Sequence, residues 1–144
     1  MPQLSVPSSL EFPITVTELL SLALYPKNKG FRKLKSYDRE KITNNLSLVG
    51  MEKYKDRLYT ELSGGQRQRV LIAKTLVATP EFLILDEPMT GVDRESKESL
   101  FHLLSHINRE HNITILMITH NLEEVEENVN KVFEIKDEKI REVK

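Results

Sequence analysis

Apolar residues recur at helical spacing in the first half of the chain. Thr15 and Glu18 form a capping-box pair, and the stretch "VTELLSLAL" that follows Thr15 predicts a short helix. From Tyr37 a second apolar face repeats every three or four residues and ends at Gly50, the expected left-handed stop of a helix. We therefore expect a small helical region over about residues 13–79.

The second half alternates predicted strands with predicted helices. The strands are continuous apolar runs, which are typical of a parallel sheet with helices on both faces. The final stretch, "KVFEIKDEKIREVK", predicts two short strands around a turn. The other expected elements are a helix at Gln66–Ala78, a strand at Phe82–Leu85, a helix carrying Leu100, Leu103, Leu104 and Ile107, and a strand at Ile113–Ile118. Residues 80–144 should therefore form part of an α/β core.

The composition excludes several functional classes but does not by itself indicate one. The 144 residues suit one domain, and 21 Lys and Arg against 22 Asp and Glu give no basic footprint for nucleic acid. The absence of cysteine excludes disulfides and thiolate metal sites. The longest apolar runs are far shorter than the roughly 18 residues of a spanning helix, and no signal peptide is visible. We expect a soluble, cytoplasmic chain without a nucleic-acid partner.

Two adjacent carboxylates follow the predicted strand "FLIL". Asp86 and Glu87 should lie at the carboxyl end of a buried parallel strand, where open α/β sheets bind ligands. In a nucleotide site the first carboxylate can hold Mg²⁺, and the second can orient and polarise an attacking water. The alternative is that both are ordinary polar residues leaving a strand.

Histidines supply two further candidates. His120 follows the second predicted strand, so it could reach a phosphate above the end of the first strand and sense it. A satisfied structural role is the alternative for this single residue. His102 and His106 lie one helical turn apart, but without a third ligand a solvated pair is favoured over a metal site.

The stretch "LSGGQ" predicts an anion cradle. Ser63 supplies a hydroxyl, Gly64 and Gly65 allow backbone amides to approach an anion closely, and a helix starting about Gln66 directs its positive end at the same place. A capped helix start with a tight turn is the alternative, and it leaves the second glycine and the glutamine unexplained.

Taken together and in this order, "LSGGQ", "FLILDEP", "TGVD" and "MITHN" resemble the nucleotide-binding subunit of an ATP-binding cassette (ABC) transporter, a P-loop NTPase-like fold. The resemblance implies that "LSGGQ" is the signature loop, which binds ATP held by a second ATPase subunit. It also implies ATP and Mg²⁺ as cofactors and transmembrane permease subunits as partners. It identifies Asp86 as the metal ligand ending the Walker B strand, Glu87 as the catalytic base, Asp93 as the D-loop aspartate, His120 as the switch histidine, and Gln3 as the glutamine that touches Mg²⁺ and the attacking water.

The sequence departs from this family in one respect. A complete subunit carries G-x-x-x-x-G-K-[ST] before the glutamine loop, and no such stretch occurs in this chain. We therefore expect the C-terminal part of a subunit, incomplete at its N-terminus, with a separate phosphate-loop segment as a possible partner. By itself the chain is predicted to be inactive as an ATPase.

Similarity also indicates the class of transporter. "FPITVTELL", "DEPMTGVD" and "ILMITHNLEEV" resemble importers of zinc, manganese or related metal ions, whose ATPases are cytoplasmic and peripheral on the inner face of the membrane. Two alternatives stay open. One is a nontransport ABC ATPase, although the short span before Leu62 lacks the heptads of a coiled coil. The other is a noncatalytic fragment that regulates a complete subunit.

Overall fold

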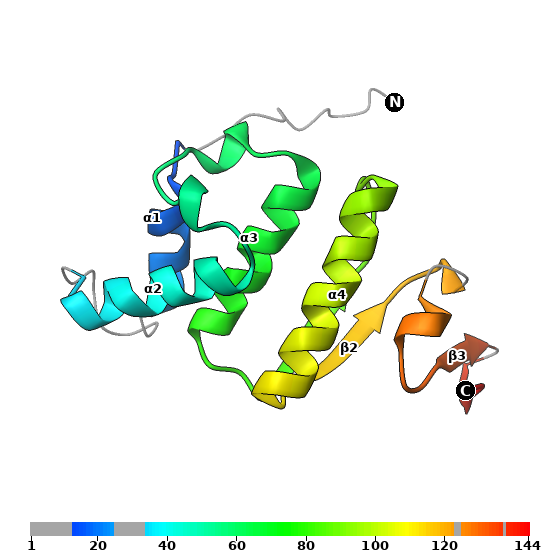
Figure 1. Cartoon of the computed structure of the whole chain (residues 1–144). Helices are drawn as coiled ribbons and strands as arrows, with labels where there is room; N and C mark the ends of the chain where they lie inside the picture. Colours follow the sequence, from blue (N-terminus) through cyan, green and yellow to red (C-terminus); the bar gives the residue numbers. More distant parts are fainter. Residues whose placement is uncertain (1–12, 25–33, 123–124, 137) are drawn as a thin grey trace, which may run out of the picture. The chain divides into compact units, whose positions relative to one another are not determined.

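A computed structural model describes residues 13–24, 34–122, 125–136 and 138–144, which divide into two compact units. The described residues up to Pro80, together with Gly91–Asp93, form the first unit, which is helical. Residues 81–90 and the described residues from Arg94 onward form the second unit, which is mixed α/β. Each unit is drawn in the colours of the sequence in Figure 1.

The first unit packs three helices around a shared apolar core. These are α1 (Val16–Ser21), α2 (Ser36–Leu48) and α3 (Gly64–Val77), and each contacts the other two. The predicted capping box of α1 is present, because the Thr15 hydroxyl accepts from the Glu18 amide and the Glu18 carboxylate accepts from the Thr15 amide. Short 3₁₀ segments complete the unit: η1 (Leu22–Leu24), η2 (Glu52–Tyr54) and η3 (Tyr59–Glu61).

The described residues of the second unit form two small sheets and one long helix. Strands β1 (Phe82–Asp86) and β2 (Thr114–Ile118) pair in parallel, and α4 (Arg94–His111) connects them and packs beside β2 (Figure 1). After the 3₁₀ segment η5 (Glu126–Asn128), β3 (Phe133–Lys136) and β4 (Lys139–Glu142) form an antiparallel hairpin. The parallel pairing and the hairpin confirm the arrangement that the sequence predicts.

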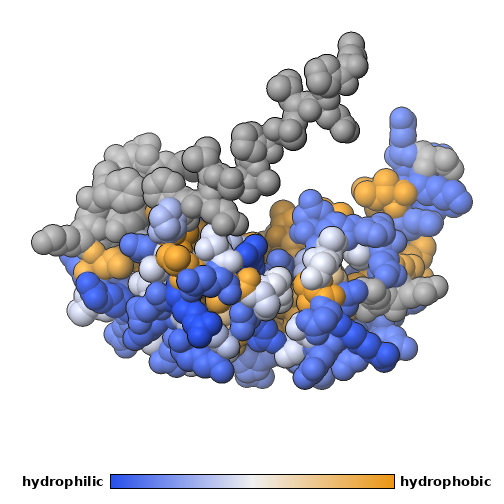
Figure 2. All heavy atoms as spheres, turned by 90° about the horizontal axis from the view of Figure 1, so that it is seen from above, coloured by the Kyte–Doolittle hydropathy of each residue, from blue (hydrophilic) through white to orange (hydrophobic). Residues whose placement is uncertain are grey.

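In the part of the chain that the structure describes, the parallel pair is covered on one face and exposed on the other. Leu83 and Leu85 are buried, whereas Ile84 is 60% exposed and its register partner Leu116 is 42% exposed. Phe82 and Ile118 are about half exposed on the same open face. The sequence predicts helices on both faces, and the described residues supply cover for one. Figure 2 shows hydrophobic residues reaching the molecular surface among hydrophilic ones.

The start of α3 differs from its predicted position. The helix begins at Gly64 rather than about Gln66 and ends at Val77. Ser63 is its N-cap, and the Ser63 hydroxyl accepts from the Gln66 amide while the Gln66 side chain accepts from the Ser63 amide. This capping box recruits both glycines into the first helical turn. The capped helix start is therefore real, and it accounts for Gln66 as well as Ser63.

None of the helices in the described part of the chain has both the length and the apolar character needed to cross a bilayer.

Candidate functional site

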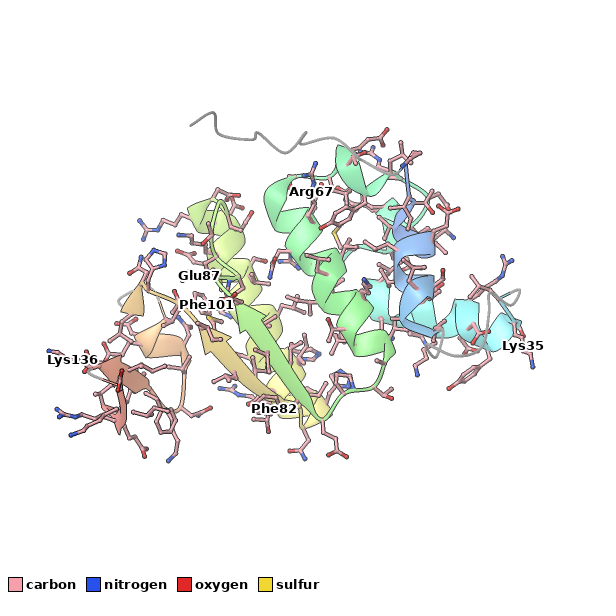
Figure 3. The ribbon with its side chains drawn as sticks, turned by 180° about the vertical axis from the view of Figure 1, so that it is seen from behind. Lys35, Arg67, Phe82, Glu87, Phe101 and Lys136 are labelled. Atoms are coloured by element: carbon pink, nitrogen blue, oxygen red, sulfur yellow. The ribbon has the colours of Figure 1, made fainter. Side chains whose placement is uncertain are left out.

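The candidate site lies where β1 and β2 end. Parallel pairing places Asp86 opposite Ile118, so both strands end at the same edge of the sheet. Beyond β1, the Glu87 amide donates to the Ile118 carbonyl at 2.9 Å and extends the pairing by one residue. In Figure 3, Glu87 lies at this end of β1 and Phe82 at the other. The carboxylates of Asp86 and Glu87 are thus carried to the edge that the sequence predicts.

Glu87 and His120 come together at this edge from positions 33 residues apart. One carboxylate oxygen of Glu87, Oε1, accepts the His120 backbone amide at 3.0 Å and lies 2.7 Å from His120 Nδ1. The His120 side chain is 82% exposed, while that of Glu87 is 35% exposed. The histidine is therefore held at its backbone amide and at Nδ1, while most of its side chain stays exposed.

Sequence reasoning missed a third contributor, Thr90. Its hydroxyl lies 3.5 Å from Glu87 Oε2, and its amide donates to the Glu87 carbonyl at 3.1 Å, which closes a turn over Pro88 and Met89. Glu87 itself has φ 46°, a left-handed conformation that is uncommon for a residue with a side chain. Thr90 begins the stretch "TGVD", but nothing in the sequence marks its contact with Glu87 or this backbone geometry in advance.

The local environment lowers the pKa of the Glu87 carboxyl. The hydrogen bond from the His120 side chain is the largest cause, and partial burial opposes it. The His120 amide, the charge of His120 and the Thr90 hydroxyl add smaller lowering effects. The lowered pKa favours the carboxylate form of Glu87. Among the residues that the structure describes, Oε1 is engaged twice and Oε2 only by the long contact to Thr90.

The glycines of "LSGGQ" occupy the first turn of α3. Ser63 and Gln66 are engaged in the reciprocal cap, and Ser63 is exposed at the helix start. A Cβ atom built on Gly64 would lie 3.1 Å from the carbonyl oxygen of Gly91, so Gly64 allows a close approach of backbone from its own chain. The anion-binding role of Ser63, Gly64, Gly65 and Gln66 stays a prediction.

The remaining predicted residues are placed only in part. Asp86 is exposed at the end of β1, and Asp93 is exposed directly before α4. Gln3 lies outside the described residues. His102 and His106 are exposed on α4, and within the described residues no cluster of three or more His, Cys, Asp or Glu side chains is arranged to hold a metal. The Asp86 carboxylate is an oxygen donor of the kind that Mg²⁺ takes from proteins, which usually supply one or two carboxylates beside substrate phosphates.

Comparison with known proteins shows the family of the chain. The family described as ABC transporter matches residues 5–90, which is more than half of the chain. The chain belongs to the ABC transporter family. Among curated members, the zinc uptake system ATP-binding protein ZurA of Listeria innocua is 45% identical over 86% of this chain and 48% of its own length. The iron(3+)-hydroxamate import ATP-binding protein FhuC of Bacillus subtilis is 42% identical over 81% of this chain and 44% of its own.

A solved ABC transporter structure shares the fold as well. The ADP conformation of an ATP-binding cassette of an ABC transporter superposes with a TM-score of 0.76 at 27% identity, covering 89% of this chain and 53% of that one. These comparisons confirm the predicted family and the fold class of an ABC ATPase. They also show that this chain spans about half the length of the relatives it matches.

Proposed function

We propose that the chain is the part of an ABC transporter ATP-binding subunit that completes the hydrolytic side of an ATP site. The observation that carries this proposal is the joining of Glu87 and His120 through Oε1, at the edge where Asp86 ends β1. The carboxylate of Glu87 and the exposed imidazole of His120 are joined at the strand edge that Asp86 also reaches, and Asp86 is the proposed Mg²⁺ ligand. A family that binds ATP, generally with Mg²⁺, uses such groups to position phosphate and water.

Each residue of the site has a proposed task. Asp86 would hold Mg²⁺, and Glu87 would accept a proton from the attacking water. Since Oε1 already accepts from His120, we expect the less engaged Oε2 to accept the proton from the water. The exposed ring of His120 would contact the terminal phosphate. Gln3 would touch Mg²⁺ and the water.

The start of α3 is proposed to serve a second nucleotide. ATP held by another ATPase subunit would bind at the loop formed by Ser63, Gly64, Gly65 and Gln66. Asp93 would take part in communication between the two subunits of that dimer. A helix N-terminus contributes about 0.3–1 kcal/mol toward an exposed anion, whereas micromolar affinity needs about 8.2 kcal/mol. The loop would therefore add a small part of the free energy of ATP binding, and the other subunit would provide most of it.

The open face of the parallel pair supports the need for a further segment. Ile84, Leu116 and Ile118 are at least two-fifths exposed on this face, and Asp86 ends it. We propose that the face is covered by a segment carrying a phosphate loop. Such a segment would bury these side chains and bring its loop beside Asp86. The length of the relatives beyond the match supports this occupant.

We further propose that the assembled transporter imports a metal ion, with zinc or manganese as cargo. The similarity to the zinc uptake ATP-binding protein named above supports this class. The iron(3+)-hydroxamate import protein has a similar sequence identity, so identity alone does not distinguish one transported substrate from another. The chain would act at the inner face of the membrane, bound to permease subunits. Copurification with a permease would support transport, whereas copurification with only a complete ATPase subunit would support a regulatory role.

The direct test measures nucleotide binding and turnover before and after completion of the domain. Calorimetry with Mg-ATP and a phosphate-release assay would be run on the isolated chain and on the chain joined to a segment that carries G-x-x-x-x-G-K-[ST]. We expect neither tight binding nor turnover before joining, and both afterwards, because the lysine and amides of that loop supply much of the charge stabilisation. The same segment with its loop lysine changed to alanine is the matched control. Micromolar binding or steady turnover by the isolated chain would contradict the proposal.

A further inference from the structure

Arg67 lies in the first turn of α3, directly after the stretch "LSGGQ" (Figure 3). Its guanidinium is turned back onto its own helical unit, because Nη2 donates to the Thr60 carbonyl of the segment that precedes α3. The guanidinium carbon also lies 5.8 Å from the centre of the Tyr59 ring, within the range of a cation–π interaction. The Arg67 side chain is therefore engaged by the segment that leads into the "LSGGQ" loop.

This one residue holds both ends of the stretch 60–63. At one end the Arg67 side chain binds the Thr60 carbonyl, and at the other end the Arg67 backbone amide donates to the Ser63 carbonyl at 2.8 Å. Between these two carbonyls, Leu62 is 4% exposed and its amide donates to the Tyr59 carbonyl at 3.3 Å. The backbone that carries Ser63 is therefore bonded to Arg67 directly, without an intervening segment.

The environment of Arg67 shows which property of arginine this position uses. Within the part of the chain that the structure describes, Arg67 Nε is buried and has no hydrogen-bond partner. A buried, unpaired donor on a charged group is unfavourable. An apolar side chain of similar length would avoid this cost, but it could not bind the Thr60 carbonyl. The directional hydrogen bond, rather than burial, is therefore the contribution that is specific to arginine here.

We propose that Arg67 is a positioning residue for Ser63, the serine of the "LSGGQ" loop. By binding the Thr60 and Ser63 carbonyls, it fixes the path of the chain that enters α3. The reciprocal cap of Ser63 and Gln66 sets the serine on the helix, and Arg67 sets the incoming segment on the same helix. This role needs no contact between Arg67 and nucleotide, because the guanidinium acts within its own chain.

The contact is tested first in the unaltered chain, so this test does not depend on the folding of a variant. In ¹⁵N NMR, rotation about the Nε–Cζ bond of Arg67 should be slower than that of Arg94 by about threefold or more, because a hydrogen bond restrains the guanidinium. Arg94 is the comparison, since its side chain is 94% exposed and its pairing with Glu98 is long, at 3.4 Å. Equal rotation rates for the two groups would overturn the proposal.

A matched pair of variants then separates positioning from general stability. Arg67→Met and Arg69→Met each remove a guanidinium from α3 and keep an unbranched apolar side chain. Arg69 is the control because its Nη1 donates at 2.9 Å to the Val49 carbonyl, at the end of α2, and not to the loop. Amide exchange resolved by residue would be measured on the isolated chain without nucleotide. The amide of Ile72, which is 1% exposed in α3, reports general loss of stability.

The two variants should differ at Leu62. Arg67→Met should speed exchange of the Leu62 amide by about fivefold or more beyond any change at Ile72, because the segment loses its bond to α3. Arg69→Met should change the amides of Leu62 and Ile72 by the same factor. If Arg67→Met also changed both amides equally, the guanidinium would contribute only to overall stability and the positioning role would be wrong.

The consequence for nucleotide binding rests on the proposed function, and the failure of either proposal can be distinguished. In the domain completed by a phosphate-loop segment, Arg67→Met should weaken Mg-ATP-dependent association of two domains by about threefold or more, because Ser63 is less well placed. The affinity of a single domain for Mg-ATP should stay near the parental value. Sedimentation and calorimetry measure the two quantities.

Two mixed outcomes assign the failure to one proposal or the other. Faster exchange at Leu62 with parental association would uphold the positioning of Ser63 and contradict the binding of a second nucleotide at its loop. Weakened association with unchanged exchange would overturn the positioning role, because Arg67 would then act on the nucleotide or on the other subunit directly.

Discussion

Glu87 Oε1 accepts from two atoms of His120, the backbone amide at 3.0 Å and the ring, whose Nδ1 lies 2.7 Å away. The amide contact would survive most substitutions at position 120, while the ring contact depends on the side chain. The backbone amide therefore supports the placement of Glu87, while the imidazole is the main cause that lowers its pKa.

Replacing Glu87 with glutamine should separate nucleotide binding from hydrolysis. Glu87→Gln in the completed domain should bind Mg-ATP as the parent does, because the amide oxygen can still accept from His120. It should lose most of its turnover, about a hundredfold or more, since an amide cannot take a proton from water. Calorimetry and phosphate release measure the two effects. A variant that hydrolyses ATP at the parental rate would remove Glu87 as the base.

Removing the imidazole should raise the pKa of Glu87. The His120 side chain is the main cause that holds this pKa below its ordinary value of 4.5, so His120→Ala should move it upward. A ¹³C titration of the Glu87 carboxyl measures the change. Thr90→Val is the matched control and should produce a smaller rise, because the Thr90 contact is long.

The same pair predicts how stability depends on pH. A carboxyl whose pKa is lowered by folding stabilises the native state above its unfolded pKa, and this contribution is lost as pH falls through the lower folded value. Urea unfolding of the parent and His120→Ala should therefore differ above about pH 4.5 and converge in more acidic solution. If the difference in unfolding free energy between the two proteins were the same above and below about pH 4.5, the substitution would act by something other than the pKa of Glu87.

The cap of α3 should carry measurable stability. Ser63→Ala removes the hydroxyl that accepts from the Gln66 amide at 3.3 Å, and it should lower the free energy of unfolding by about 0.5–2 kcal/mol. Ser63→Asp, which can still accept this bond, should recover most of the loss. Urea denaturation monitored by circular dichroism checks both variants. Equal losses in the two variants would argue against the capping role.

The stability cost of removing an apolar side chain from the open sheet face should rise when a phosphate-loop segment completes the domain. Ile84→Ala should change the stability of the isolated chain by less than about 0.5 kcal/mol, because the side chain is already 60% exposed. In the domain completed by a phosphate-loop segment the cost should rise to about 2–5 kcal/mol. Leu83→Ala, at the buried neighbour, should be costly in both states. A cost at Ile84 that stays small after completion would show that the segment leaves this face open.

The sequence alone determined most of the elements and the family. Thr15 with Glu18 defined the start of α1, and Gly50, with φ 71°, lies at the expected left-handed stop after α2. The motifs around Ser63, Asp86 and His120 identified an ABC transporter domain, because their order and spacing are specific even where each motif alone is weak. Local propensity and motif order are properties of the chain itself, so a single sequence reveals them.

Tertiary structure decided how the candidate residues relate to one another. Only parallel pairing of β1 and β2 brings His120 to Glu87 from 33 residues away, and only the turn geometry brings Thr90 to the other carboxylate oxygen. The expected start of α3 was two residues late, because reciprocal capping by Ser63 and Gln66 draws both glycines into the helix. The contact of Gly64 with Gly91 also emerged only in three dimensions. Hydrogen bonds and close approaches between distant segments depend on how the chain folds back on itself, and the local sequence does not determine that arrangement.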